Sequence, residues 1–327
     1  MKRSELLARI LIMVAVIGAV GTPLYFWART PLIHARVAEN GGWSPNVIQA
    51  EVGKPLHLQL TSDDVTHGFA VGQMDMQSVD VLPGKVTDLI LTFDKPGTYT
   101  FYCTRWCGVN HWRMRGTIEV TGGPNVSQPV NTPLYVMLSL NIDAPHDAPL
   151  IPKEKPSAAR GQQLAANLQT DQFINSNFYR AHSPYQTFEE LNSTSLSDSE
   201  KWDVVSYIWK SNTTFESLTD GQKLFAQNCA ACHGENGAGN GVFADQLKTA
   251  GEAAAQTMEG AQNMTMQTPA NFTDPKRMLG ASPALLQGKL LRGGMGTGMP
   301  SWGPIFAPEQ TWDLIAYLYS FQFEYQK

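Results

Sequence analysis

All four cysteines of this 327-residue chain lie in two closely spaced pairs, and the two pairs stand in different kinds of sequence. Cys103 and Cys107 close a region of short β-type runs, whereas Cys229 and Cys232 lie in a helical pattern and are followed directly by His233. Four cysteines in an exported protein would ordinarily suggest two disulfides. Histidine follows both pairs here, and methionine also follows the first, so their surroundings favour metal ligation instead.

Between about residues 43 and 122 the sequence consists of short runs rich in β-branched and aromatic residues, with turns such as Lys-Pro-Gly between several of them. Such runs predict strands. The predicted strands span residues 46–52, 55–61, 78–82, 86–93, 98–103 and 115–120. This spacing of strands and turns is typical of a small β-sandwich.

A proline-rich stretch follows the predicted sandwich, with seven prolines between Thr121 and Ala158. Proline removes a backbone donor and interrupts helices, so the stretch predicts an irregular linker. One further strand is expected within it, at residues 134–140.

Beyond the linker the periodicity becomes helical and two pairs of segments resemble each other. GQQLAANL at residues 161–168 resembles GQKLFAQN at 221–228, and residues 197–210 resemble residues 307–320. Residues 158–212 would be the first copy of a repeat. They lack the cysteine motif, so we interpret them as a degenerate half-repeat. The alternative is a chance pair of amphipathic helices.

The first cysteine motif, FYCTRWCGVNHWRM, supplies Cys103, Cys107, His111 and Met114, and the upstream segment TSDDVTHGF supplies His67. Two thiolates on one loop can each bridge the same two metal ions, while two imidazoles and a thioether complete the coordination. Soft sulfur with imidazole favours copper, so a dinuclear copper centre is predicted. The alternatives are a four-ligand zinc site or a disulfide with surface histidines, and neither requires Met114.

The second motif reads Cys229-Ala-Ala-Cys232-His233. Two thiols at this spacing can add to the two haem vinyl groups, while the next residue presents its imidazole to the iron. A redox-active cysteine pair beside an incidental histidine is the alternative. A covalently attached haem c is the favoured interpretation, because a haem-sized segment follows the motif.

A second axial ligand is expected from LLRGGMGTGMPSWG near the end of the chain. Met299 is the preferred candidate, and Met295 is the runner-up. Arg292 is a candidate partner for a haem propionate, with a solvated arginine as the alternative. Both predicted metal centres have filled coordination, which suits electron transfer rather than substrate chemistry, so no residue is assigned a catalytic role.

An uncharged stretch at residues 10–27 has 18 residues, which is enough to span a bilayer. Basic residues before it favour a cytoplasmic N-terminus, so residues 1–34 are predicted as a single-pass anchor with the rest of the chain outside. The alternative is a cleaved signal peptide, and either interpretation exports the remainder. The formal net charge of −5 argues against a nucleic-acid partner.

Residues 43–120 resemble the CuA domain of cytochrome c oxidase subunit II. The matching positions are the Asp64-Val-Thr-His67 segment, Cys103, Cys107, His111 and Met114. The resemblance implies one copper held by His67 and Met114, and a second held by His111 and the backbone carbonyl of Arg105. Cys103 and Cys107 would bridge both ions.

Two departures from that family stand out. Arg105 occupies a position where the family usually has glutamate, which often helps to bind magnesium, so the departure counts against a magnesium site here. The single predicted span replaces the usual two-helix hairpin and is similar to the B-type branch of haem-copper oxidases. The same superfamily contains nitric oxide reductases with a CuA-bearing subunit.

Residues 215–325 resemble class I cytochromes c, with Met299 in the G-M-P-x-W context typical of the axial methionine. Together the two resemblances imply the electron-input subunit of a haem-copper terminal oxidase. Such a subunit would sit in the cytoplasmic membrane of a prokaryote, with both redox domains on the outer side. It would pass electrons from an external donor (a soluble cytochrome c, a small copper protein or a quinol-oxidising complex) to a polytopic haem-copper catalytic subunit that reduces oxygen. The alternatives are the equivalent subunit of a nitric oxide reductase and a free-standing anchored electron-transfer protein.

The expected architecture is therefore multidomain, with one transmembrane helix, a cupredoxin-like β-sandwich and an all-α cytochrome c domain. The predicted segments are an anchor at 1–34, a copper domain at 35–122, a linker at 123–157, the haem-free half-repeat at 158–212 and the cytochrome c domain at 213–327.

Overall fold

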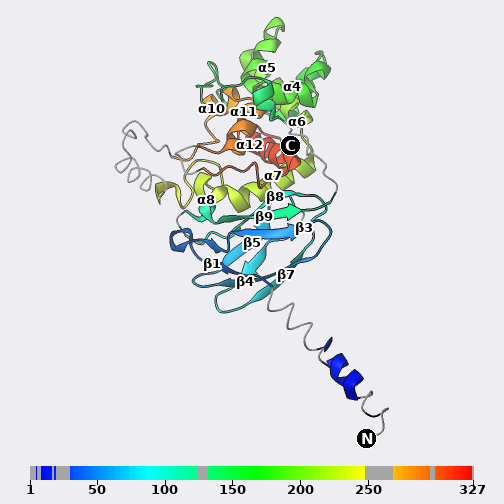
Figure 1. The fold of residues 1–327 in the computed structure, drawn as a ribbon. Helices are drawn as coiled ribbons and strands as arrows, with labels where there is room; N and C mark the ends of the chain where they lie inside the picture. The colour runs from blue at the N-terminus through cyan, green and yellow to red at the C-terminus, as the bar shows by residue number, and fades with distance from the viewer. Residues whose placement is uncertain are drawn as a thin grey trace. The chain divides into compact units, whose positions relative to one another are not determined.

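The computed structural model describes residues 5, 9–16, 18, 19, 30–74, 76–108, 110–123, 132–246, 268–294 and 299–325. These residues form two compact units, one built from strands and one from helices (Figure 1). This division confirms the predicted order of a β-sandwich followed by a helical domain. Each unit is described separately below.

Nine strands make up the described part of the first unit. They are β1 (Leu32–Ala35), β2 (Trp43–Ser44), β3 (Val47–Glu51), β4 (Leu56–Ser62), β5 (His67–Val71), β6 (Val79–Val81), β7 (Thr87–Leu91), β8 (Gly97–Tyr102) and β9 (Arg115–Thr121). All six strands predicted from the sequence are present. Three strands were not predicted. Strands β1 and β2 are short, and the five residues of β5 are all buried and therefore show no polar alternation.

The strands form two sheets, ordered β2-β1-β4-β7 and β3-β9-β8-β5-β6. The β1–β4 and β3–β9 pairs are parallel, whereas the remaining pairs are antiparallel. Alternate residues of β3 and β9 are buried, as expected for strands with one face on a core. The core side chains with the least exposure include Ile33, Leu58, Leu60, Phe69, Phe93, Phe101 and Ile118.

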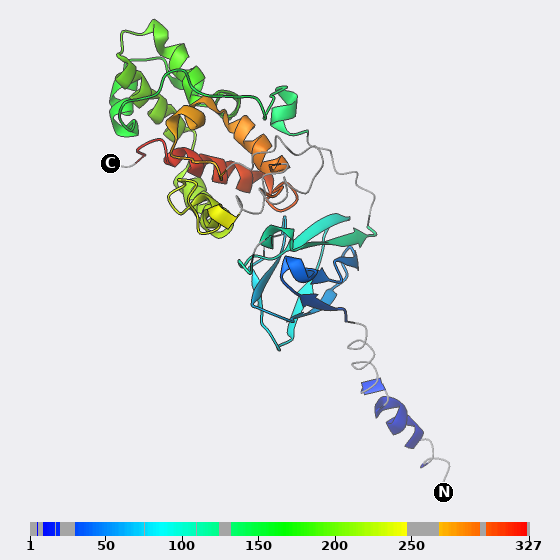
Figure 2. The same cartoon turned by 90° about the vertical axis from the view of Figure 1, so that its left-hand side faces the viewer.

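The second unit is helical. Its helices are α2 (Leu134–Met137), α3 (Ala158–Ala165), α4 (Ser176–Ala181), α5 (Pro184–Glu190), α6 (Asp198–Ser211), α7 (Phe215–Asn228), α8 (Ala230–His233), α10 (Pro275–Gly280), α11 (Pro283–Arg292) and α12 (Pro308–Ser320). Short 3-10 turns occur in the chain at Ala38–Asn40, His111–Arg113, Asp171–Phe173 and Leu191–Ser193. Helix α12 packs against both α7 and α11 (Figure 2).

Local signals explain where the longer helices begin. Ser197 precedes α6, its hydroxyl accepts from the Glu200 amide, and the Glu200 carboxylate accepts from the Ser197 amide in return. Thr214 caps α7 in the same position. Helices α11 and α12 each start with proline, whose fixed φ suits the first helical turn.

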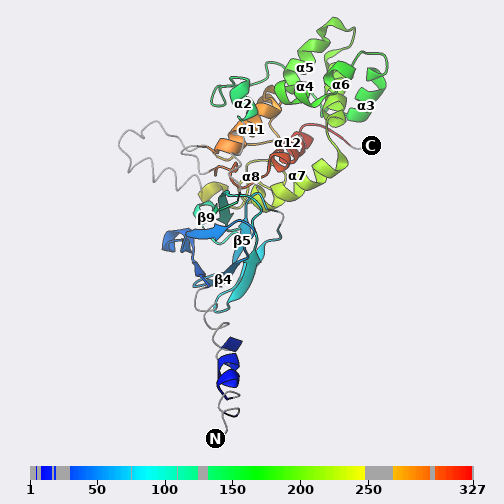
Figure 3. The same cartoon turned by 45° about the vertical axis from the view of Figure 1, so that its right-hand side comes forward.

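The predicted strand at residues 134–140 is wrong. Residues Leu134–Met137 instead form the single helical turn α2, which follows Pro133 and lies beside α11 (Figure 3). Tyr135 and Ile142 pack over Gly288 of α11. The described part of this helical unit offers the segment no strand to pair with, so packing against α11 overrides its β-type composition.

The rest of the proline-rich stretch, from residue 132 onward, is irregular as predicted, but it packs closely against helices. Ile142 and Ala148 are buried, and the Ala148 amide donates to the Lys276 carbonyl at 2.7 Å. This part of the stretch therefore belongs to the helical unit. Residues 124–131 lie outside the described residues.

The two pairs of similar segments pack in the same way. Helix α3 packs against α6 as α7 packs against α12. A side chain at Gly161 would fall on the Asp203 carbonyl, and one at Gly221 would fall on the Asp313 carbonyl. In each pair glycine lets two helix backbones approach closely. The structure thus explains why both copies begin with glycine.

Replacing Gly221 with alanine should destabilise the helical unit by about 1–3 kcal/mol, the usual cost of overpacking a close contact. At an unconstrained helix position the same change would stabilise, because alanine is the better helix former. Denaturant unfolding of the full chain measures the effect, with the exposed Gln222→Ala change on the same helix as control. A gain in stability for Gly221→Ala would contradict the close packing.

Among the described residues no helix has the length and apolar character needed to cross a bilayer. Only residues 10–16, 18 and 19 of the predicted span at 10–27 fall within the described residues. The anchor therefore stays a prediction.

Candidate metal centres

Strand pairing brings the predicted copper ligands to one edge of the five-stranded sheet. His67 begins β5, Cys103 directly follows β8, and Met114 directly precedes β9. Strand β8 pairs antiparallel with both β5 and β9, so the end of β8 meets the start of β9. Because the three strands are adjacent, ligands 47 residues apart in sequence, His67 and Met114, converge.

Each of the two imidazoles lies close to one of the two sulfurs. The Cys103 Sγ and Cys107 Sγ atoms are 4.0 Å apart. His67 Nδ1 lies 3.8 Å from Cys103 Sγ, and His111 Nδ1 lies 3.6 Å from Cys107 Sγ. The ligand atoms of His67, Cys103 and Cys107 all fall within 4.8 Å of one another. This set fits a copper site.

The remaining two predicted ligands also face the sulfurs. Met114 Sδ lies 3.1 Å from Cys107 Sγ, and the Arg105 carbonyl oxygen lies 3.2 Å from Cys103 Sγ. A thioether on this site favours copper over zinc, which prefers nitrogen and thiolate donors. Which ligands belong to which copper ion stays a prediction, because each sulfur would contact both ions.

Electrostatics favour a thiolate at Cys103. Hydrogen bonding from Cys107 is the largest of the contacts that lower the pKa of Cys103 to about 3, and His111 and His67 add to it. Sharing that proton raises the pKa of Cys107. Cys103 is thus the sulfur favoured as a thiolate, which is the form that binds metal ions.

Asp64 orients His67. Its carboxylate lies 2.7 Å from His67 Nε2, which leaves Nδ1 directed at the sulfurs. Backbone amides of Val37 and Val65 donate to the same carboxylate at 2.7 Å. Burial would lower the pKa of His67, but its contacts with Cys103 and Asp64 outweigh burial and raise it. A carboxylate behind a ligating histidine fixes the ring and increases its basicity.

An aromatic cluster packs beside the copper ligands. Trp43 meets Phe69 and Phe101 edge-on, with ring centroids 5.6 and 5.8 Å apart. Its indole Nε1 also donates to the Met114 carbonyl at 3.1 Å. Nothing in the local sequence links Trp43 to a ligand 71 residues away, so this contact emerges only from the structure. These rings exclude water and restrain the site, which reduces reorganisation during electron transfer.

The haem attachment motif lies where α7 gives way to α8. Cys229 follows α7, and His233 ends α8. His233 Nδ1 lies 3.0 Å from the Ala270 carbonyl, so it donates there as the neutral tautomer and leaves Nε2 for iron. Desolvation lowers the pKa of His233, which keeps the ring neutral. Phe272 stacks on the ring with centroids 4.6 Å apart.

Burial favours the thiol form of the two cysteines in this motif. Burial raises the pKa of Cys229 to about 12 and that of Cys232 to about 11. Neither cysteine is joined in a disulfide, so both sulfurs are available to form thioethers with the haem vinyl groups. With an oriented imidazole beside them, these residues fit covalent haem.

The segment carrying Met299 is fastened to the end of α11. The Met299 carbonyl accepts from the Gly294 amide at 3.1 Å, and the Trp302 amide donates to the Leu290 carbonyl at 3.1 Å. A side chain at Gly293, which has φ of 74°, would collide with the Met299–Pro300 backbone. Met295 lies outside the described residues. Axial ligation by Met299 stays a prediction.

Arg292 has a protein partner. Its guanidinium forms two hydrogen bonds with Asp143, at 2.6 and 2.7 Å. The predicted propionate contact would compete with this ion pair, whose two residues are 149 positions apart in the sequence.

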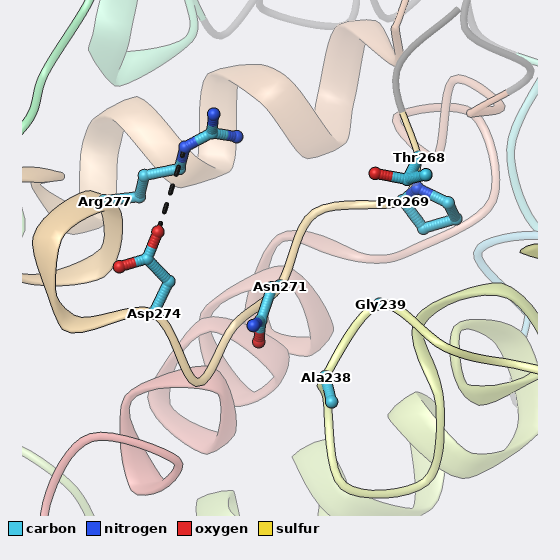
Figure 4. A pocket seen from close by; sticks show the side chains of 7 residues that line it. All are labelled: Ala238, Gly239, Thr268, Pro269, Asn271, Asp274 and Arg277. Carbon is cyan, nitrogen blue, oxygen red and sulfur yellow. Dashed lines mark ion pairs between the residues drawn. The ribbon is translucent and has the colours of Figure 1, made fainter.

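A different arginine, Arg277, faces a cavity of about 470 Å³ beside the haem attachment loop (Figure 4). The lining residues are Ala238, Gly239, Thr268, Pro269, Asn271, Asp274 and Arg277. The Gly239 amide donates to the His233 carbonyl at 2.7 Å, which ties the cavity wall to the histidine. Arg277 is 4.0 Å from Asp274 and was not identified from the sequence, because no local pattern marks it.

Two family models match the chain. Residues 44–121 match the periplasmic domain of cytochrome c oxidase subunit II, and residues 218–322 match cytochrome c. A cytochrome c oxidase subunit 2 of Thermus thermophilus is 42% identical over 79 residues, covering 24% of this chain and 58% of that protein. A further subunit 2 from Thermus thermophilus is also 42% identical, over 24% of this chain and 46% of that protein.

The chain spans about half the length of these curated relatives. Among solved structures, the periplasmic domain of subunit II of cytochrome oxidase from Bradyrhizobium japonicum is 29% identical, covering 23% of this chain and 54% of that chain with a TM-score of 0.22. The family matches fall on the two units whose ligands are described above. The chain therefore carries a cytochrome c oxidase subunit II domain, which implies CuA, followed by a cytochrome c domain, which implies haem c.

Proposed function

We propose that this chain is the electron-input subunit of a membrane-bound haem-copper terminal oxidase that reduces oxygen. The observation that carries the proposal is the convergence of six ligand groups, from His67 to Met114, at one sheet edge in a chain that also holds a haem attachment motif. When bound, each cofactor takes up and releases one electron at a time. The protein groups around them hold ligands in place, and the predicted ligand sets fill the coordination of both metals.

In electron transfer, the role of the protein groups is to hold the metal ligands in fixed positions. Asp64 fixes the His67 ring, Trp43 holds the Met114 backbone, and the Ala270 carbonyl fixes the His233 ring. Ligands that keep their positions in both oxidation states lower the reorganisation needed for each transfer. The chain acts as a relay, and the reduction of oxygen belongs to a separate polytopic subunit.

We further propose that the apolar stretch at residues 10–27 anchors the chain and that both redox domains lie outside the cytoplasmic membrane of a prokaryote. Residues 9–16 are helical, and apolar side chains such as Leu11 and Ile12 are 67% and 64% exposed. A helix with this much uncovered apolar surface needs a lipid or protein environment. Strand β1 begins at Leu32, five residues after Trp27, so the copper domain would follow the anchor directly.

The electron donor would dock on the cytochrome c domain. Glu216 and Asp220 on α7 and Glu309 on α12 lie near Asp313 of α12. Burial, together with the charges of these three carboxylates, raises the pKa of Asp313 to about 6. Such a concentration of negative charge favours a basic donor surface and would speed its association.

The test is to isolate the intact complex from membranes through a tag on this chain, and to measure oxygen and nitric oxide consumption side by side. Copurification of a polytopic haem-copper subunit with oxygen consumption is the expected result. Consumption of nitric oxide alone would make the chain part of a nitric oxide reductase. Recovery of this chain without a catalytic subunit would support a free-standing electron-transfer protein instead.

A further inference from the structure

The loop that carries both bridging cysteines is held by an ion pair from a neighbouring strand. The Arg105 guanidinium forms two hydrogen bonds with Asp80 of β6, Nε to Oδ1 at 2.6 Å and Nη2 to Oδ2 at 2.7 Å. This parallel, two-point geometry is the strongest form of an arginine–carboxylate contact and fixes the orientation of both groups. Neither residue was given a partner by the sequence.

Strand β6 is itself fixed to the strand that carries His67. In the β5–β6 register, Asp80 lies directly opposite Gly68, the residue after His67. A side chain at Gly68 would meet the Arg105 amide at 3.1 Å and the Arg105 Cγ at 3.2 Å, so the stem of Arg105 crosses over this glycine. The guanidinium then reaches Asp80 on the next strand.

Two more contacts fasten the same loop. The Thr104 amide donates to the Gly68 carbonyl at 3.2 Å, and the Thr104 hydroxyl hydrogen-bonds Ser78 just before β6. These contacts fasten the loop next to Arg105, whose carbonyl oxygen lies 3.2 Å from Cys103 Sγ. The backbone of Arg105 faces the copper site while its side chain faces Asp80.

We infer that Asp80 is a positioning residue for the copper pair: by binding the Arg105 side chain, it sets where the Arg105 carbonyl meets the metal. The inference rests on the proposed ligand role of that carbonyl. Any residue at position 105 would offer the same backbone carbonyl. The side chain of Arg105 is therefore available to anchor the loop. Sharing one electron equally between two coppers requires similar ligand fields, and a displaced carbonyl would unbalance them.

The pair is poorly suited to a role in folding alone. The side chains of Arg105 and Asp80 are 54% and 45% exposed. Exposed ion pairs contribute little to folding stability, because water screens them. Their effect should therefore appear at the copper site rather than in the melting of the sandwich.

The test compares the copper-loaded full chain with its Asp80→Asn variant. We expect unequal hyperfine coupling to the two copper nuclei by electron paramagnetic resonance, a shifted copper midpoint potential, and loss of copper to a chelator roughly tenfold faster, the low end of effects for such supporting contacts. The matched control is Asp88→Asn, which removes an exposed strand carboxylate bonded to Gln59 in the other sheet. It should match the wild type.

A charge-swapped double variant, Asp80→Arg with Arg105→Asp, separates positioning from a general structural effect. It keeps a backbone carbonyl at residue 105 and can re-form the ion pair, so it should regain much of the wild-type spectrum and potential. An Asp80→Asn chain with wild-type hyperfine coupling and potential would overturn the inference alone. A wild-type chain with no mixed-valence copper signal would overturn the copper assignment, and the inference with it.

Discussion

Replacing Cys103 with serine should abolish the mixed-valence copper signal and reduce donor-driven turnover by more than about 100-fold. Loss of a contact that only supports a ligand lowers metal affinity by about 10–100-fold, and loss of a bridging ligand should cost more. The Cys103 thiolate lies close to both His67 Nδ1 and the Arg105 carbonyl. A serine hydroxyl is a hard, weakly acidic donor and does not bridge copper at neutral pH. The haem should remain rapidly reducible by the donor.

The reciprocal variant is His233→Ala, which should block donor-driven turnover while leaving the copper signal intact. This pair of results is expected if electrons enter at the haem and leave through copper. Stopped-flow reduction of haem and copper, alongside steady-state turnover, measures both steps. His57→Ala is the control, since His57 is an exposed residue of β4 and belongs to neither predicted ligand set. Copper that is reduced at the normal rate in the His233→Ala chain would show that the haem is an accessory.

Replacing Met299 with alanine should remove the sulfur-to-iron charge-transfer band from the oxidised near-infrared spectrum. Thioether ligation raises a haem potential, so the midpoint should fall by roughly 0.1 V or more, given that axial ligands tune haem potentials over about 0.8 V. The contacts of the Met299 segment with α11 hold the backbone independently of the side chain, so the fold should persist.

Two other methionines make the test specific. Met278→Ala changes a buried packing residue of α10 and should leave the band unchanged. Met295→Ala addresses the other candidate ligand in the same loop. If the band disappears with Met295→Ala and survives Met299→Ala, the axial assignment is wrong and Met295 is the ligand.

Short-range chemistry could be read directly from the sequence. Cys229, Cys232 and His233 are adjacent in the chain, so their spacing alone specifies haem attachment, and α8 then places them with few alternatives. The loop from Cys103 to Met114 is equally local. Strands β3 and β9 were also predicted, because residues that will be buried alternate with residues that will be exposed along their sequence.

Contacts between distant residues were decided only by the tertiary structure. Asp80 pairs with Arg105 across 25 residues, and Arg292 pairs with Asp143 across 149 residues. No local pattern links the two members of either pair. Residues Leu134–Met137 have β-type composition, yet they form a helical turn because α11 is the surface available to them. Local propensity is worth a fraction of a kcal/mol per residue, so burial against a neighbour overrides it.

The copper site depends both on the sequence alone and on the tertiary structure. The sequence determined which side chains can bind metal, since thiolate, imidazole and thioether donors are properties of the residues. The pairing of β5 with β8, and of β8 with β9, decided that His67 lies beside Cys103 and that Met114 lies beside Cys107. Donor chemistry is fixed residue by residue, whereas the distance between donors exists only once the sheet has brought separate strands together.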